Sequence, residues 1–403
     1  MRKGVWMLYA AGEKSSQPAM RTADIVIVGG GIIGASVAYH LLERDPRLAV
    51  VLLEKELEVG TGSTSKATGG VRHQFSTEPN IRLTQLSYRY FTDAEAILGR
   101  PVDFIAHGYL FVTADPRTLA HSMASVALQQ RLGVPSQVVT PEAMRSFLPQ
   151  LNVEDLEGGT FCPADGSADP HGLLQGFLAR ARDRGLTLRL GEAMTAVLRD
   201  KDRVGGVATA RERYRAPVVV NAAGPFADQV GALAGVEIPS RPYRRQVLVT
   251  EPLPSFPEVF PLIVDLDTGW YVHRQGKSAV LMGGTDKDSA PGMDATVDWD
   301  AFDLVFSAAR KRVPPLAEAK VMRAYAGVRD LTPDYHGILG EAPELPGFYV
   351  ACGFSGHGFM HAPTIGLLMA ELILDGRASS MDIAPLSLER FKSGRLKVEA
   401  NMF

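Results

Sequence analysis

Three glycines and one glutamate have the spacing of a dinucleotide-binding turn. Gly29, Gly31 and Gly34 form a Gly-x-Gly-x-x-Gly pattern, and Glu54 follows 20 residues after Gly34. The first glycine permits a sharp turn, the second lets backbone N–H groups approach a pyrophosphate, and the third allows a helix to pack closely on a strand. A carboxylate at position 54 would accept hydrogen bonds from ribose hydroxyls and repel a 2′-phosphate. The pattern therefore favours FAD or NAD over NADP.

The elements around these residues have the order that such a turn requires. Residues 24–28 form a short β-rich apolar run, residues 32–44 have a helical pattern, and residues 48–53 form a second β-rich run. We therefore predict a βαβ unit, with the glycines between the first strand and the helix.

The rest of the chain alternates strands and helices. Helices are predicted at 82–98, 141–147, 173–184, 299–312 and 364–374, and strands at 103–113, 134–140, 187–190, 193–199, 204–210, 216–221 and 347–352. Residues 241–285 contain short β runs separated by Pro and Gly turns, which is typical of an antiparallel sheet. Nucleotide-binding elements at both ends enclose a β-rich middle. This order predicts two interleaved domains, each discontinuous in sequence.

Composition excludes several classes of protein. The 403 residues include 42 Lys and Arg against 45 Asp and Glu, so the net charge of −3 disfavours a nucleic-acid partner. Cys162 and Cys352 are the two cysteines, and they form neither a disulfide framework nor a zinc-binding spacing. The longest apolar run, residues 25–39, is shorter than the roughly 20 residues of a membrane-spanning helix. Residues 1–22 resemble a signal peptide only faintly, so we expect a cytoplasmic protein.

Five segments together resemble the FAD-dependent D-amino-acid oxidase superfamily. They are GGGIIG with Glu54, GSTSKATGGVRHQF, VVVNAAGPFA, YAGVRDLTPD and ACGFSGHGFMHAPTIGLLMAELILDG. The most similar members are sarcosine and dimethylglycine oxidoreductases, glycine oxidase and dye-linked proline dehydrogenases. The resemblance implies an α/β fold (α+β overall) in which a glutathione-reductase-like FAD-binding Rossmann domain is interleaved with an antiparallel β substrate domain. The FAD domain would comprise residues 23–100, 150–235 and 325–390, and the substrate domain 101–149 and 236–324. Residues 1–22 would form an N-terminal extension and 391–403 a C-terminal tail.

The resemblance also implies which residues contact FAD. Small residues let the backbone approach a flat cofactor, and the amides of residues 353–358 before a helix would face the flavin ring where negative charge grows on reduction. The expected contacts are Gly29, Gly31, Ile32, Ile33, Gly34, Glu54, Lys55, Gly62, Ser63, Thr64, Lys66, Gly69, Gly70, Val197, Ala222, Gly224, Gly327, Arg329, Gly356, His357, Gly358 and Phe359. Without a ligand, the loop at 62–70 would be a flexible linker and the segment at 221–224 a strand-ending turn.

Two positions depart from the family patterns for covalent flavin. Some subfamilies attach FAD through a Cys just before the T-P-D motif or through a His in the glycine-serine loop, and these positions are Gly327 and Lys66 here. Neither can form the link, so we expect non-covalent FAD, with His73 as the one nearby residue that leaves the question open.

The electron acceptor is open as well. The lysine that promotes reaction with oxygen in monomeric sarcosine oxidase aligns with Leu281 or Met282, although Lys277 and Lys287 are close in sequence. The acceptor is therefore either O2 or, as in a dehydrogenase that reacts slowly with O2, a quinone, a dye or a partner subunit.

For the substrate, the resemblance implies a small amino acid or amine whose carboxylate binds a guanidinium. Arg329 matches the carboxylate-binding arginine of glycine and D-amino-acid oxidases, and Arg72 matches one used by sarcosine oxidase, whose second cation is replaced here by Met360. Arg329 could instead form a structural ion pair with Asp330 or Asp334. Tyr271 and His273 would point to one face of a strand and either wall the pocket or pack in the core. His357 is either part of the site or a hydrogen-bonding residue behind it.

The implied reaction is hydride transfer from the carbon beside the amine nitrogen to flavin N5, which needs no general base. No metal site, catalytic triad or phosphate-transfer motif is apparent in the sequence. The competing interpretation is an FAD-containing electron-transfer or assembly subunit of a larger complex, with little turnover of its own. Homo- or hetero-oligomers are compatible with either.

Overall fold

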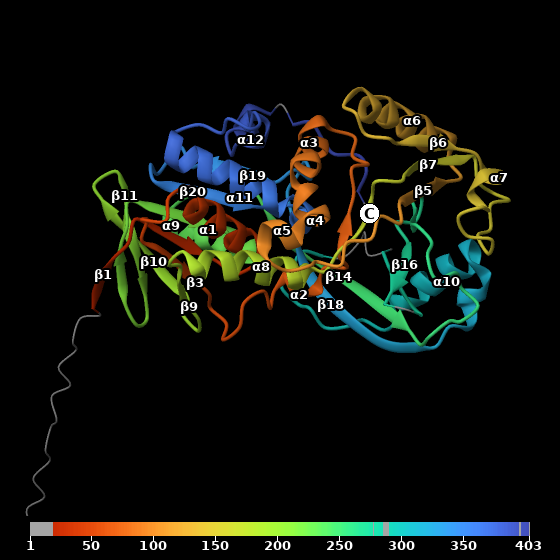
Figure 1. Ribbon diagram of the computed structural model, residues 1–403, viewed down its shortest axis with the longest axis horizontal. Helices are drawn as coiled ribbons and strands as arrows, with labels where there is room; N and C mark the ends of the chain where they lie inside the picture. The colour runs from red at the N-terminus through yellow and green to blue at the C-terminus, as the bar shows by residue number, and fades with distance from the viewer. Residues whose placement is uncertain (1–18, 277, 285–289, 395, 403) are drawn as a thin grey trace, which may run out of the picture.

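Two large sheets meet in the middle of an elongated molecule (Figure 1). The computed structural model describes residues 19–276, 278–284, 290–394 and 396–402. Residues 1–18 of the expected extension, and Lys277 and Lys287, lie outside the described residues.

The first sheet has six strands and is buried on both faces. Its order is β19-β20-β13-β2-β3-β9, parallel except for β19. The strands are β2 (Ile25–Val28), β3 (Val50–Leu53), β9 (Thr187–Arg189), β13 (Val218–Asn221), β19 (Ile338–Glu341) and β20 (Phe348–Cys352). In β2, Ile25 and Ile27 join one apolar core while Val26 and Val28 join another. The alternation shows why a continuous apolar run forms this strand: both of its faces are covered.

Helices cover one face of this sheet, and a smaller sheet with one helix covers the other. The first face carries α1 (Ile32–Arg44), α8 (Pro170–Asp183) and α11 (Gly358–Asp375). The second carries α9 (Ala227–Ala234) and a four-stranded sheet of β1 (Met20–Thr22), β12 (Arg213–Arg215), β11 (Arg203–Thr209) and β10 (Met194–Asp200). The predicted βαβ unit is thus confirmed as β2-α1-β3.

The second sheet has eight strands in the order β18-β14-β17-β16-β15-β5-β7-β6. They are β5 (Tyr109–Thr113), β6 (Gln137–Val139), β7 (Gly158–Cys162), β14 (Arg241–Thr250), β15 (Leu262–Asp265), β16 (Tyr271–Gln275), β17 (Ala279–Gly283) and β18 (Val321–Leu331). Strands β14 to β17 pair antiparallel, as residues 241–285 predicted. One face packs on α10 (Phe302–Arg312) and η2 (Pro314–Glu318), and the other carries Tyr109 and Tyr271 toward the first sheet.

One boundary between the expected domains needs adjustment. Strand β7 lies inside the range 150–235 that we assigned to the FAD domain, but it pairs with β5 and β6. We therefore propose that the substrate domain extends to about residue 163.

The predicted helices differ from the observed ones most clearly in three places. The helix predicted at 82–98 is divided into α3 (Glu78–Ser87), α4 (Arg89–Thr92) and α5 (Ala94–Leu98). Helix α11 begins six residues before the predicted start at 364, although Pro363 lies inside it. Helix α6 (Pro116–Arg131) was not predicted at all, despite the helix-start pattern at Asp115, whose carboxylate accepts hydrogen bonds from the amides of Arg117 and Thr118.

The remaining elements are short. They are α2 (Ser63–Lys66), β4 (Gly70–Val71), α7 (Pro141–Met144), β8 (Gly166–Ser167), η1 (Gly224–Phe226), η3 (Ala384–Leu386) and α12 (Arg390–Ser393). Among the described residues, no helix is both long and apolar enough to cross a membrane.

Residues 396–402, within the range expected to be a tail, return to the middle of the molecule. Figure 1 shows the dark blue segment after α12 passing beside α3 toward the junction of the two sheets. Glu399 is 1% exposed and Asn401 8%. Glu399 and Asn401 are therefore packed against the rest of the protein, whereas residues 396–398 and Ala400 stay exposed.

We predict that Gly366→Ala destabilises the first sheet. A Cβ atom at Gly366, in α11, would lie 2.3 Å from Ser36 Oγ and 2.5 Å from its carbonyl oxygen in α1, so the two helices would have to separate. Overpacking of this kind costs about 1–3 kcal/mol. Urea unfolding should detect the loss, whereas Gly292→Ala, with no atom within 4 Å of its Cβ, should stay within about 0.5 kcal/mol of wild type. Equal stability of the two variants would show that α1 and α11 are not held at this distance.

Candidate functional site

A cavity of about 730 Å³ lies between the two sheets. The carboxyl ends of β2, β3 and β20 and the residues after β13 line it from the first sheet, and β14, β16 and β18 line it from the second. Ligands of open parallel sheets bind at this edge, and the volume falls within the range of small-molecule sites.

The three glycines of the β2–α1 turn have different structural roles. Gly29 has φ +114°, and a Cβ there would lie 2.3 Å from the carbonyl oxygen of Ala222. At Gly34 a Cβ would lie 2.0 Å from the carbonyl oxygen of Gly29, so this glycine allows close packing of α1 on the turn, as predicted. At Gly31 the nearest atom is Thr64 Oγ1 at 3.4 Å, and Gly31 lines the cavity. The protein itself thus leaves room at Gly31, where the pyrophosphate of a dinucleotide would approach the backbone.

Glu54 ends β3 beside this turn. Its Oε2 accepts a hydrogen bond of 2.8 Å from Gly30 N, and its Oε1 accepts one of 2.9 Å from Glu56 N. These bonds fix the carboxylate at the cavity wall, which Lys55, Ala193 and Met194 also line. The position suits a residue that binds ribose hydroxyls.

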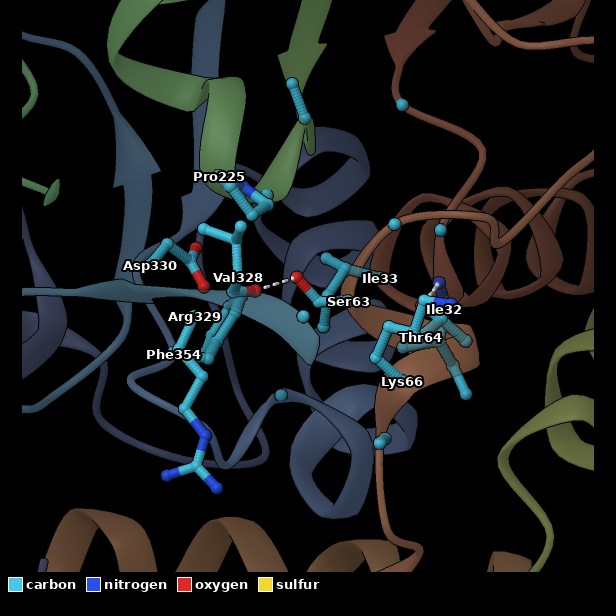
Figure 2. Close-up of a pocket in the computed structure, with 18 of the residues that line it drawn as sticks. Ile32, Ile33, Ser63, Thr64, Lys66, Pro225, Val328, Arg329, Asp330 and Phe354 are labelled. Atoms are coloured by element: carbon cyan, nitrogen blue, oxygen red, sulfur yellow. Dashed lines mark hydrogen bonds between the residues drawn. The ribbon is translucent and has the colours of Figure 1, made fainter. Parts of the chain in front are cut away.

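The small-residue loop joins the two sheets. Thr64 Oγ1 accepts a hydrogen bond of 3.1 Å from Ile32 N in α1, and Ser63 Oγ donates one of 2.6 Å to the carbonyl oxygen of Val328 in β18 (Figure 2). Both hydroxyls are therefore structural links between the nucleotide turn and the second sheet. The rest of the predicted loop set also lines the cavity: Gly62, Lys66, Gly69 and Gly70.

Backbone that follows strands of the first sheet forms another wall of the cavity. Ala222 and Gly224 follow β13, and Gly356, His357, Gly358 and Phe359 lead into α11. Because α11 starts at Gly358, its N-terminal amides and the positive end of its dipole face the cavity more directly than a start at 364 would allow.

Arg329 enters the cavity from β18. Arg329 and Asp330 leave the strand on opposite faces (Figure 2). A Cβ at Gly356 would lie 3.1 Å from Cδ and Nε of Arg329, so the absence of a side chain at 356 makes room for the guanidinium. Asp334 forms its ion pair with Arg390, at 2.8 Å from Nε. Asp330 Oδ2 accepts a hydrogen bond of 2.7 Å from Gly353 N, and burial raises the pKa of Asp330 to about 6.

Arg72 is a buried, hydrogen-bonded guanidinium at the same cavity. It is 2% exposed, donates to the carbonyl oxygens of Gln74 and Asn401, and stacks on Phe75 with Cζ 3.8 Å from the ring centre. Burial lowers the pKa of Arg72 to about 10, so the guanidinium stays charged near neutral pH. Arg72 Nη2 lies 3.3 Å from His357 Nε2.

His357 is a neutral ring at this wall. Burial, and after it the charge of Arg72, keep the pKa of His357 well below its usual value. A guanidinium only donates hydrogen bonds, so Nε2 accepts from Arg72 and the ring proton is on Nδ1. His357 is thus suited to orient neighbouring groups and not to carry a positive charge.

Two aromatic residues complete this end of the cavity. Tyr271 lines it as predicted, together with Tyr109 of β5, which the sequence reasoning missed. Tyr109 is fully buried, and its hydroxyl lies so close to Gly70 that a Cβ there would be 1.9 Å away. The sequence predicted that Tyr109 lies in an apolar strand, but it could not predict that its hydroxyl lies next to Gly70.

Further residues were missed and others lie elsewhere. Arg245, Met293 and Ala295 also line the cavity, from β14 and the segment beside it. Among the described residues, Val197 is not part of the lining, because it lies in β10 beyond Ala193 and Met194 and packs against the core of the smaller sheet. His273 is buried in β16 behind the lining, and Gly34 acts through packing alone.

His73 belongs to a buried polar cluster outside the cavity lining. His73, Cys162 and Asp165 bring possible metal-ligand atoms within 4.8 Å of one another. His73 Nδ1 is hydrogen-bonded to Asp165 Oδ1 at 2.8 Å, and burial, with the charge of Asp165, raises the pKa of the Cys162 thiol. A protonated thiol is a poor metal ligand, so we interpret the cluster as a hydrogen-bonded part of the core.

Comparison with known proteins agrees with the resemblance found in the sequence. The family described as "FAD dependent oxidoreductase" matches residues 24–372. Mitochondrial sarcosine dehydrogenase of Mus musculus is 31% identical over 394 residues, which cover 93% of this chain and 42% of that protein. The chain thus spans less than half the length of that relative.

Solved structures show the same fold. L-proline dehydrogenase from P.horikoshii has a TM-score of 0.87 at 29% identity, covering 94% of this chain and 100% of that one. Glycine oxidase from Geobacillus kaustophilus has a TM-score of 0.81 at 25% identity, covering 92% and 99%. These matches confirm the predicted fold class. Because the family match covers residues 24–372, this chain belongs to the FAD-dependent oxidoreductase family, and the nucleotide turn, Glu54 and the cavity between the sheets agree with this.

Proposed function

We propose that this protein oxidises the C–N bond of a small amino acid or secondary amine of the sarcosine, glycine or proline type. The observation that carries the proposal is that one cavity joins the nucleotide turn to the guanidinium of Arg329. FAD, when bound, supplies the acceptor for a hydride from the carbon beside the nitrogen. The protein then has to bind the substrate, orient it and exclude water.

The residues at the Arg329 end suit these tasks. A guanidinium binds a carboxylate through two parallel hydrogen bonds, which fixes the orientation of the adjacent carbon. Tyr109 and Tyr271 supply buried aromatic walls for a short side chain or an N-methyl group. Because His357 is neutral, the positive charge at this end of the cavity comes from the arginines. An amine that binds unprotonated needs no further base to lose its hydride.

The names of the relatives support this substrate class. Sarcosine, proline and glycine dehydrogenases or oxidases act on compounds that carry an amine nitrogen on the carbon next to a carboxylate. The identities of 25–31% support the class and not one member of it. The cytoplasmic location and the oligomeric state stay predictions.

We also propose that electrons leave through an acceptor other than O2. Leu281 and Met282, the positions aligned with the oxygen-activating lysine, are buried apolar residues of β17. A quinone, a dye-like carrier or a partner subunit would then reoxidise the protein.

Non-covalent binding of FAD rests on two contacting positions. A Cβ at Gly327 would lie 2.6 Å from Cβ of Lys66, so the two positions used for covalent attachment in relatives lie side by side, and neither carries a thiol or an imidazole. Acid or heat precipitation should therefore release the yellow colour into the supernatant. Flavin fluorescence that stays with the precipitated chain would contradict this.

We predict that Gly31→Ala weakens FAD binding by at least about tenfold without unfolding the apoprotein. The added Cβ meets only Thr64 Oγ1, at 3.4 Å, but projects into the space that the pyrophosphate needs. Flavin titration of the apoprotein measures the affinity, and urea unfolding measures stability, which should change by less than about 0.5 kcal/mol. Gly292→Ala, outside the cavity, is the matched control. Unchanged affinity would place the pyrophosphate elsewhere.

We predict that Arg329→Ala slows anaerobic flavin reduction by an amino acid by about 10- to 150-fold, from a charge-assisted contact worth roughly 1.5–3 kcal/mol. Arg329→Lys should recover part of the rate, because an ammonium replaces the fork by a point charge. Arg323→Ala, an exposed arginine of the same strand, is the control.

The decarboxylated amine gives the sharper comparison. Its slower reduction of the flavin should be nearly unaffected by Arg329→Ala, since it has no carboxylate to lose. If Arg329→Ala slows both compounds equally, Arg329 is a structural residue and the assignment is wrong.

A further inference from the structure

Residues 399–402, which the sequence analysis assigned to a C-terminal tail, pack behind Arg72. Residues 399–402 lie between α3 and the loop that carries Arg72, far in sequence from both. The contacts of Glu399 and Asn401 fix this arrangement.

Glu399 is tied to the N-terminal end of α3. Its Oε1 accepts hydrogen bonds from Ser76 N at 2.7 Å and Ser76 Oγ at 2.6 Å, and its Oε2 accepts from Thr77 Oγ1 at 2.7 Å and Asn80 Nδ2 at 3.1 Å. A carboxylate at this end of α3 also meets the positive end of the helix dipole. Although burial raises the pKa of Glu399, the hydrogen bonds from Ser76 and Thr77 outweigh it and hold the pKa below the usual value.

Asn401 connects the segment that holds Glu399 to Arg72. Its carbonyl oxygen accepts a hydrogen bond of 2.7 Å from Arg72 Nη2, and its side chain donates to the carbonyl oxygen of Gln74. Among the charges that act on Arg72, that of Glu399 is the strongest in favour of the guanidinium. The same Nη2 lies 3.3 Å from His357 Nε2, and both Arg72 and His357 line the cavity.

We propose that residues 399–402 set the geometry of the substrate end of the cavity, with Glu399 as the positioning residue that holds Arg72 and His357 in place. Glu399 does not line the cavity among the described residues, so it acts through Asn401 and Arg72. The proposal rests on the proposed function, because it assigns the Arg72 side of the cavity to the substrate. It also gives Arg72 a role different from a second carboxylate anchor: its hydrogen bonds to Gln74 and Asn401 make it a fixed cation of the wall.

The test is Glu399→Gln, which keeps the shape of the side chain and removes its charge. Glu389→Gln is the matched control, since it makes the same chemical change at an exposed site ten residues earlier. Ser76→Ala is a milder second variant, because Ser76 Oγ donates to Glu399 and accepts from Ala400 N at 2.8 Å. It keeps the test available if Glu399→Gln does not fold.

Three readouts on the FAD-loaded protein separate the positioning of the wall from carboxylate binding. Hydrogen exchange and the visible flavin spectrum report on the wall without any turnover. We expect faster exchange in peptides covering 70–77, 354–360 and 396–402, and a changed spectrum, with flavin content unaltered. The affinity for propionate, followed by its perturbation of the flavin spectrum, reports on carboxylate binding. We expect it to weaken by about tenfold in Glu399→Gln, less in Ser76→Ala, and not at all in Glu389→Gln.

The outcomes distinguish the two proposals. Unchanged exchange and spectrum in Glu399→Gln and Ser76→Ala would overturn the positioning role, whatever the affinities are. A loosened wall with propionate affinity within twofold of wild type would show that residues 399–402 serve folding and not the substrate end. If wild type binds no carboxylate and no amino acid reduces its flavin, the proposed function fails, and the exchange and spectral readouts still decide whether Glu399 positions Arg72 and His357.

Discussion

The close approach of Gly29 to the carbonyl oxygen of Ala222 is the constraint on which the site depends. It brings the ends of β2 and β13 within a distance that excludes any side chain, and Gly34 lets α1 start directly against the same turn. Gly366 allows a similar close approach between two helices, because α11 packs there directly on Ser36 of α1. Helices α1 and α11 are therefore fixed relative to one another by close packing at Ser36 and Gly366.

The second sheet is attached to this frame by polar contacts. Ser63 bonds the carbonyl oxygen of Val328, and this fixes β18 beside the nucleotide turn so that Arg329, the next residue, projects into the shared cavity. On the other side, Arg72 and His357 join the loop after β4 to the start of α11. Burying the charge of Arg72 is costly unless it is hydrogen-bonded, and two backbone carbonyls meet that need. The Arg329 end of the cavity and its nucleotide-turn end are thus parts of one packed unit.

Local patterns predicted the parts of the molecule that local physics determines. The β2-α1-β3 unit was legible because its glycines and apolar runs act within 30 residues. Asp115 and Pro116 form a helix-start pattern that could have predicted α6. In contrast, no evident sequence signal predicts that the helix expected at 82–98 is divided into α3, α4 and α5. The partners of Arg72, the insertion of residues 399–402 and the position of Tyr109 could not be predicted, because each depends on residues far apart in the chain. Val197 was misplaced by a few residues along β10, which a single sequence without relatives cannot correct.

The central claim is that one cavity brings a small amino acid to the flavin, and the most direct measurement is anaerobic titration of the FAD-loaded protein. Sarcosine, glycine and L-proline, each paired with its decarboxylated amine, would be added while the visible flavin absorbance is followed, with dithionite as the positive control. The account predicts that at least one amino acid bleaches the flavin, and does so faster than its decarboxylated counterpart. Bleaching by dithionite alone would contradict it and favour an electron-transfer or assembly subunit.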